Sequence, residues 1–122
     1  MIAAREGSEN HTVAAAARDA DGGIHTGVNV YHFAGGPCAE LVVIGAAAAS
    51  TDAALTAIVA VGDHGRGVIP PCGRCRQTLL DYFPDIRVLV PDAGAVTTVE
   101  VSALLPWTYD WRAHQELATP TD

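Results

Sequence analysis

Apolar residues occur in short runs along this chain, separated by glycine, aspartate and proline. Val13–Arg18 is apolar but mostly alanine, which makes it a weak strand, and the Asp-Ala-Asp-Gly-Gly sequence at 19–23 predicts a turn. Ile24–Val30 alternates apolar and polar positions and carries β-branched residues, which is typical of a strand. These two runs therefore predict a hairpin.

Two helices are predicted, and each follows a proline. Pro37 precedes Cys38–Ala49, which has the composition of a buried helix. Pro70-Pro71 precedes Cys72–Phe83, whose leucines and phenylalanine lie near one face. Proline suits the start of a helix because a residue of the first turn needs no N–H donor. Both helices are therefore expected to begin close to a cysteine.

The remaining runs complete an alternating order. Strands are predicted at Ala57–Val61, Arg87–Val90 and Val96–Val101, with loops at 62–71 and 91–95. Ser102 is expected to cap a single helical turn ahead of Pro106, and the polar segment 112–122 is expected to be a flexible tail. The order β-β-α-β-α-β-β predicts a three-layer α/β domain around a mixed sheet, because strands and helices alternate in its middle.

Composition excludes several classes of function. The 122 residues suffice for one domain, and with 49% hydrophobic and 17% charged residues a packed core is expected. A net charge of -7 with scattered cations leaves no basic face for nucleic-acid phosphates. No apolar run reaches the roughly 18 residues of a membrane span, and no signal-peptide pattern opens the chain. Three cysteines, an odd number, argue for a reducing, cytoplasmic compartment and against a disulfide framework.

The cysteines carry the most specific signal. Cys72 and Cys75 form a Cys-x-x-Cys at a predicted loop-to-helix junction, and Cys38 begins the other central helix. Two thiolates three residues apart on a first helical turn can face one ion, and the helix dipole favours their ionised form. Helix starts that follow parallel strands lie on one edge of a sheet. Three thiolates can therefore converge from two helix N-termini.

Three protein ligands leave a fourth position for water, which is the arrangement of a catalytic zinc. Glu40 lies two residues from Cys38 and points elsewhere on the first turn, so it is free to carry protons beside the metal. Other interpretations remain open at this point. The Cys-x-x-Cys could be redox-active, the cysteines could be core residues, or His32 or His64 could complete a structural zinc site. A zinc-stabilised scaffold without turnover is a further alternative.

Cys38-Ala39-Glu40 together with Pro71-Cys72-Gly73-Arg74-Cys75 resembles the zinc-dependent cytidine deaminase superfamily in its three-cysteine form. Within it, segments 26–43, 66–77 and 104–111 are similar to the blasticidin-S deaminase branch. The resemblance covers roughly residues 11–111, so the whole chain, 1–122, is interpreted as a single zinc deaminase domain with this core. It implies a five-stranded mixed sheet with helices on both faces, and a homotetramer. It also implies one Zn²⁺ per subunit on Cys38, Cys72 and Cys75, with Glu40 as the proton shuttle.

The resemblance also implies where a small nucleoside-type substrate binds. Contacts are expected from Thr12, Arg66 and Tyr109, with Trp111 close by, and from backbone groups at Ala39 and around Pro71. Asn29 either positions a sugar hydroxyl or satisfies the end of a strand. Arg66 suits a substrate carboxylate because guanidinium binds carboxylates in bidentate geometry.

At two positions the sequence departs from the superfamily pattern, and these departures change the expected charge balance at the metal and the expected substrate. Leu41 stands where ordinary members have an arginine that offsets thiolate charge, and Arg74 is placed to donate to the sulfurs instead. Tyr31 stands where ordinary members have a ribose-binding glutamate. The predicted reaction is therefore hydrolytic deamination of the cytosine ring of blasticidin S or a close aminoacyl-nucleoside, giving the uracil-type product and ammonia. Cytidine, deoxycytidine or another small amino-heterocycle is the alternative substrate.

Overall fold

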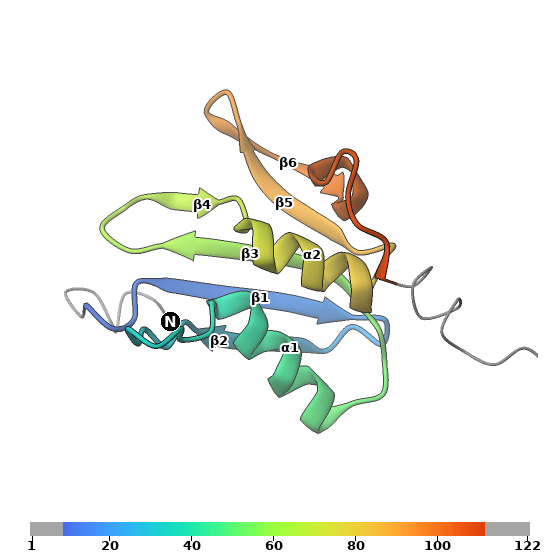
Figure 1. The fold of residues 1–122 in the computed structure, drawn as a ribbon, viewed down its shortest axis with the longest axis horizontal. Coiled ribbons are helices and arrows are strands. Elements are labelled where there is room, and N and C mark those ends of the chain that lie inside the picture. Colours follow the sequence, from blue (N-terminus) through green and yellow to red (C-terminus); the bar gives the residue numbers. More distant parts are fainter. Residues whose placement is uncertain (1–8, 112–122) are drawn as a thin grey trace, which may run out of the picture.

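The computed structural model describes residues 9–111 (Figure 1). The elements within this range follow the predicted alternation of strands and helices. In chain order they are β1 (Val13–Asp19), β2 (Ile24–Val28), α1 (Ala39–Ser50), β3 (Leu55–Gly62), β4 (Gly67–Ile69), α2 (Gly73–Tyr82), β5 (Arg87–Asp92), β6 (Ala95–Glu100) and the 3₁₀ helix η2 (Val101–Leu104).

One mixed sheet contains all of these strands in the order β2-β1-β3-β5-β6, with β4 paired to β3. β1 is antiparallel to both neighbours, so that Ala16 lies opposite Thr26 of β2 and Val59 of β3. β3 and β5 are parallel, with Ile58 opposite Val88. The predicted α/β class and mixed sheet are confirmed.

Both α-helices lie on the same face of the sheet (Figure 1). α1 connects β2 to β3, and α2 follows β4 and leads into β5. From β2 to β3 and from β3 to β5 the chain steps across the sheet in the same direction. Right-handed crossovers in one direction place their helices on one face. The helical layer predicted for the other face contains no α-helix of residues 9–111.

The core lies between this sheet face and the two helices. β1 and β2 present small residues where α1 packs closely, and a Cβ at Gly27 would lie 2.8 Å from Val42 Cγ1. The fully buried side chains come from both helices, the strands and the adjoining turns, and the largest of them are Leu79, Ile86, Val43, Val88, Val101 and Cys75. Helix and sheet are thus held together by apolar burial that extends to the first turn of α2.

Two local expectations are wrong. The segment 62–71 is not entirely loop, because Gly67–Ile69 forms β4 against the end of β3, with Val61 opposite Val68. Three residues after a glycine-rich turn carry too little periodicity to indicate a strand. Ser102 does not cap the terminal turn, because it lies within η2, whose N-cap is Glu100. No helix in the described range is both long and apolar enough to span a bilayer.

The β1–β2 turn is organised around the buried carboxylate of Asp19. Its Oδ1 accepts hydrogen bonds from the backbone N–H groups of Asp21 (2.8 Å) and Gly23 (2.9 Å). Its Oδ2 lies 2.8 Å from His25 Nε2. The hydrogen bonds from His25 and Gly23 lower the pKa of Asp19 below its ordinary value. The ionised form of Asp19 therefore stabilises the folded hairpin.

Asp19→Asn is expected to lower the urea midpoint of unfolding at pH 7, because it removes the charged acceptor. A lowered folded-state pKa gives stability that is present above the unfolded value near 3.9 and lost as pH falls through the folded value. The difference between wild type and variant should therefore shrink below about pH 4. Asp21→Asn in the same turn is the control, since the backbone of Asp21 makes the contact. A pH-independent difference would contradict this account.

Candidate active site

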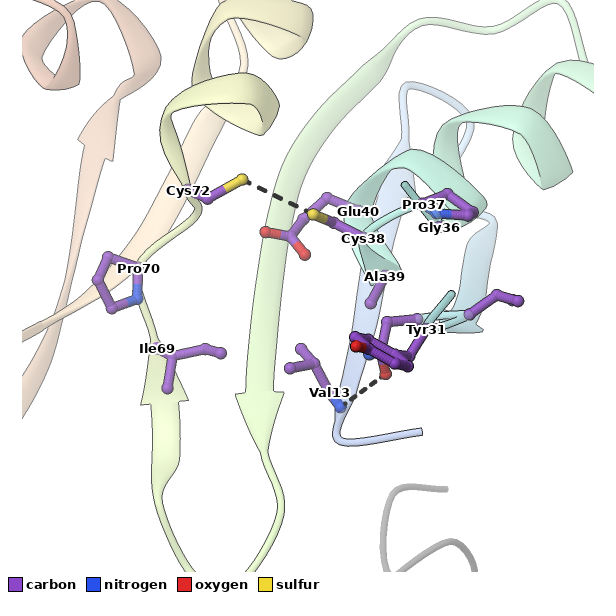
Figure 2. Close-up of a pocket in the computed structure, with 12 residues that line it drawn as sticks. Val13, Tyr31, Gly36, Pro37, Cys38, Ala39, Glu40, Ile69, Pro70 and Cys72 are labelled. Atoms are coloured by element: carbon purple, nitrogen blue, oxygen red, sulfur yellow. Dashed lines mark hydrogen bonds between the residues drawn. The ribbon is translucent and has the colours of Figure 1, made fainter. Parts of the chain in front are cut away.

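Two helix N-termini bring the three cysteines together. Cys38 is the N-cap of α1 and Cys72 the N-cap of α2, and neither side chain caps its own helix. Cys75 is buried one turn into α2. The three Sγ atoms all lie within 4.8 Å of one another, and those of Cys38 and Cys72 are 3.7 Å apart (Figure 2). The predicted convergence is present.

This cluster fits a tetrahedral zinc ion. Zinc–sulfur bonds of about 2.3 Å at tetrahedral angles separate the two sulfurs by about 3.8 Å, close to the Cys38–Cys72 distance. No other histidine, cysteine, aspartate or glutamate among residues 9–111 joins the cluster. Neither His32 nor His64, proposed as a fourth ligand, belongs to it, so residues 9–111 would leave one coordination position of the ion open.

The electrostatics of the cluster favour a cation. Burial raises the pKa of the Cys75 thiol above its ordinary value, and the charges of Glu40 and the other sulfurs add to the effect. Burial also acts to raise the pKa of Cys72, but hydrogen bonds from Cys75 and Cys38 outweigh it and lower that pKa. Three thiolates and a carboxylate can all be ionised together only if a positive charge lies among them. The donor set therefore matches a metal centre.

Glu40 lies in the first turn of α1 with only 5% of its surface exposed. Burial raises the pKa of its carboxyl group, and a backbone hydrogen bond and the Cys75 thiol partly offset that rise. The carboxyl group lies beside the sulfurs of Cys38 and Cys72 (Figure 2). A carboxyl group with a raised pKa at such a position is suited both to accept and to release a proton.

Arg74 lies between the two ligands of the Cys-x-x-Cys and turns back toward the third. Its Nη2 donates to Cys38 Sγ at 3.3 Å and to the backbone oxygen of Gly36 at 3.1 Å. The hydrogen bond to Cys38 raises the pKa of the Arg74 guanidinium. Arg74 is thus in the position expected of a donor that offsets the charge of the sulfurs.

A cavity of about 280 Å³ opens beside the cluster. Ile69 and Pro70 form one side, and Val13 and Tyr31 lie opposite (Figure 2). Five of the residues expected at the site on sequence grounds line it, namely Asn29, Cys38, Ala39, Glu40 and Cys72. Tyr31, which stands at the ribose-binding position of the superfamily pattern, also lines it. The lining residues that sequence reasoning missed are Val13, Val30, Gly36, Pro37, Ile69 and Pro70. Gly36, Pro37, Ile69 and Pro70 lie within three residues before Cys38 or Cys72, which is the signal that could have identified them.

A tight loop places Tyr31 in the wall of the cavity. Val30 N–H donates to the oxygen of Pro37 and Tyr31 N–H to the oxygen of Asn10, each at 3.1 Å. A Cβ at Gly36 would lie 1.8 Å from the Val30 oxygen, so only glycine allows the loop to close. The tyrosine side chain is therefore held at the cavity by its backbone.

Asn29, Thr12 and Arg66 form one hydrogen-bonded cluster at the start of β1. Asn29 Oδ1 accepts from the N–H groups of Thr12 (2.8 Å) and Val13 (3.0 Å), and Asn29 Nδ2 donates to Thr12 Oγ1 (3.2 Å). Arg66 Nη2 donates to the Thr12 oxygen (2.8 Å) and to Asp63 Oδ1 (2.9 Å). Asn29 satisfies the strand end, as one of its two predicted roles requires. Thr12 and Arg66 do not line the cavity.

The other predicted substrate contacts also lie outside the cavity lining. Tyr109 and Trp111 are 60% and 41% exposed, and their segment runs along α2. Pro71 is buried behind Glu40, next to a small void bordered by Ile58 and Val88. Within one chain the structure therefore gathers the metal half of the predicted site, and the outer substrate contacts lie apart from it.

The chain is similar in sequence to known deaminases. No protein-family model matches the chain. It is 33% identical to a blasticidin-S deaminase from Bacillus cereus over 108 residues, which is 81% of this chain and 77% of that protein. It is 34% identical to a cytidine deaminase from Halalkalibacterium halodurans over 116 residues, or 88% and 87% of the two chains. The chain belongs to the cytidine deaminase superfamily.

Solved structures agree with this assignment. A cytidine deaminase from Mycobacterium tuberculosis superposes with a TM-score of 0.70 at 32% identity, over 85% of this chain and 83% of that one. The enzyme from Mycobacterium leprae gives 0.69 at 33% identity, over 84% and 87%. The recognition made from the cysteine pattern is confirmed, and the protein is a hydrolytic deaminase.

Arg74→Ala is expected to lower turnover by roughly tenfold or more while zinc content falls less, because residues that support metal ligands tune the metal. Without the guanidinium the sulfurs stay more negative, so the acidic limb of the pH–rate profile should move to higher pH. Metal analysis of the purified protein and kcat measured across pH test this. Arg74→Lys, which keeps the charge, should have a kcat between those of the wild type and Arg74→Ala. An unchanged pH–rate profile in Arg74→Ala would contradict the assigned role.

Proposed function

We propose that this chain is a zinc-dependent aminohydrolase that removes the amino group from the cytosine ring of blasticidin S or a close aminoacyl-nucleoside. Cys38, Cys72 and Cys75 are its metal ligands and Glu40 is its proton carrier. The observation that carries the proposal is the buried Glu40 carboxyl group beside three converging sulfurs whose fourth coordination position is open. A structural zinc site has no use for such a carboxyl group, which argues against a scaffold without turnover.

When bound, zinc supplies a water molecule activated for attack at neutral pH. Glu40 would accept a proton from the attacking water and deliver it to the ring nitrogen next to the carbon that bears the amino group. The same carboxyl group would then take the proton of the newly added hydroxyl group and deliver it to the amino group, which departs as ammonia. Water enters and ammonia leaves, so the net reaction converts the cytosine ring to the uracil type without an oxidant or reductant.

Binding of the ring is assigned to backbone groups at the cavity floor. Ala39 is fully buried between the ligand Cys38 and Glu40, and Pro71 directly precedes the ligand Cys72. Peptide groups at these positions can pair with the polar edge of a pyrimidine, since both lie in segments fixed by the metal ligands. Thr12, Tyr109 and Trp111 are assigned to the outer part of the substrate.

Arg66 is assigned to a substrate carboxylate. Its guanidinium is held in place by the Thr12 oxygen and by buried Asp63, and the side chain remains 47% exposed. An arginine oriented before binding loses little conformational entropy when it meets a carboxylate. The resemblance to blasticidin-S deaminase supports this choice, because blasticidin S carries a carboxylate on its sugar.

Cytidine or deoxycytidine is the second candidate substrate. The Halalkalibacterium halodurans protein, which this chain matches over 87% of its length, is a cytidine deaminase. Against cytidine stands the exposed ring of Tyr31 in the cavity wall, where the superfamily pattern places a ribose-binding carboxylate.

We further propose that the protein acts as a homotetramer. The sheet face away from the helices carries apolar residues such as Ala16, Val59 and Leu89, which alternate with core positions and have no α-helix of residues 9–111 above them. Ile24 and Val96 are 63% and 51% exposed. Apolar surface of this kind commonly marks contacts between subunits.

Glu40→Gln is expected to reduce kcat by about 10²–10⁴-fold, because the amide cannot carry protons. Zinc content and the thermal midpoint of unfolding should stay close to wild type, since no metal ligand changes. Ammonia release and loss of the cytosine absorbance measure turnover. A variant that retained its turnover would exclude Glu40 as the proton carrier.

Substrate choice is tested by kcat/KM for blasticidin S, cytidine and 2'-deoxycytidine on wild type and on Arg66→Ala. We expect blasticidin S to be the best substrate of the wild type. The variant should lose about tenfold or more on blasticidin S, because a charge-assisted hydrogen bond is removed, and far less on the nucleosides, which have no carboxylate. Preference for cytidine in the wild type would establish the second candidate. An equal loss on all substrates would mean that Arg66 only supports the loop.

A further inference from the structure

The segment 101–111, here called the C-terminal arm, is fastened to α2 by two consecutive side chains. Arg76 Nη1 donates to the backbone oxygen of Leu104 at 3.3 Å. Gln77 Oε1 accepts from Thr108 Oγ1 at 2.9 Å, and Gln77 Nε2 donates to the backbone oxygen of Tyr109 at 3.2 Å. The arm passes from β6 across to α2 (Figure 1). It therefore contacts the helix whose first turn carries two metal ligands.

The same Arg76 side chain also reaches the segment that leads into that helix. Its Nε donates to the backbone oxygen of Pro71 at 2.7 Å, the shortest of these contacts. Pro71 is buried and directly precedes Cys72. One guanidinium thus joins the arm at Leu104 to the peptide that bears a metal ligand.

This contact matters because the segment before Cys72 has few other means of being held. Pro70 and Pro71 have no N–H groups, so their backbone can be anchored only through carbonyl oxygens. The oxygen of Pro71 lies in the same peptide plane as the Cα of Cys72. A hydrogen bond to this oxygen therefore fixes the orientation of the peptide plane, and with it the position of the Cα atom that carries the Cys72 side chain.

We propose that Arg76 is a positioning residue that couples docking of the C-terminal arm to the geometry of the metal ligand Cys72. Metal binding and arm docking then stabilise each other, because a coupling free energy between two sites acts in both directions. The proposal rests on the metal site of the proposed function and is independent of the substrate. Gln77 holds the arm at a second point but does not touch the ligand segment.

The fork of the guanidinium makes arginine specific for this role. Two of its nitrogens donate to oxygens that belong to segments 33 positions apart in the sequence, Pro71 and Leu104. A lysine ammonium carries the same charge on a different geometry and cannot reproduce the planar fork. Comparison of the two residues therefore separates the bridge from a general effect of positive charge near the sulfurs.

The test is the zinc affinity of the full chain, measured by competition with a chromophoric chelator. Arg76→Met should bind zinc about 10- to 100-fold more weakly, the range found for residues that orient metal ligands. Arg76→Lys should recover only part of this loss. Arg87→Met removes an exposed arginine that pairs with Glu100 at 3.7 Å and should bind zinc as the wild type does.

The reverse direction is tested by hydrogen exchange. Removal of zinc from the wild type should speed exchange of the Leu105 N–H group, which bonds to the Ser102 oxygen within the arm. Gln77→Leu and Thr108→Val, which loosen the arm without touching a ligand or its loop, should weaken zinc binding several-fold. These two variants also carry the test if Arg76→Met fails to fold, as judged by circular dichroism.

The outcomes separate this inference from the proposed function. The coupling would be overturned if Arg76→Met bound zinc with wild-type affinity, or if hydrogen exchange at Leu105 were the same with and without zinc. Either result would leave the deaminase assignment intact. A wild-type chain that binds no zinc would overturn both. Weakened zinc binding in Arg76→Met, Gln77→Leu and Thr108→Val, with Arg87→Met unchanged, supports the coupling.

Discussion

The concentration of negative charge at the starts of two helices is the constraint on which this structure depends. Three thiols and the Glu40 carboxyl group lie together beside one cavity, and two of these four groups, Cys75 and Glu40, are buried. Burial opposes ionisation of each, and each charge opposes the others. The helix N-termini supply partial positive charge and Arg74 supplies a whole one, but the guanidinium reaches only one sulfur. A divalent cation would offset the remaining negative charge, and the Cys38 and Cys72 sulfurs lie at a distance that suits two ligands of one ion.

The fold serves this constraint by bringing the two helix starts to one edge of the sheet. The parallel pairing of β3 with β5 aligns the two crossovers, and both then cover the same face. Small residues in β1 and Gly27 in β2 let α1 pack closely, while Leu79 fixes α2 in the core. The metal cluster is therefore positioned by apolar packing away from it, and the sulfurs need not hold the helices together. This division leaves the thiols free to serve as ligands.

The elements that sequence reasoning predicted well are those with a strong local cause. Pro37 and Pro71 mark helix starts, and the cysteine spacing predicts convergence because helical geometry admits few alternatives. β4 could not be predicted, since three residues become a strand only because the end of β3 offers an unpaired edge. The family pattern placed Tyr31 at a ribose-binding position, but the sequence did not indicate which other residues form the cavity walls, or how Tyr31 is brought there. Tyr31 reaches the site through a loop closure that Gly36 permits, and such closure depends on contacts between distant segments.

The residues predicted to contact the outer part of the substrate show that a family motif can identify a residue without identifying its role. Asn29 lines the cavity, yet its amide holds the backbone of Thr12 and Val13, and Arg66 holds the same strand from the other side. These residues stiffen the start of β1, and Val13 forms a wall of the cavity because of them. A polar residue of the family pattern can thus shape the site by holding the backbone, as well as by contacting the substrate. Loss of either role, support of the backbone or contact with the substrate, would reduce activity. Only a residue that contacts the substrate directly should affect substrates with the contacted group more than substrates without it, so its substitution has to be measured on several substrates.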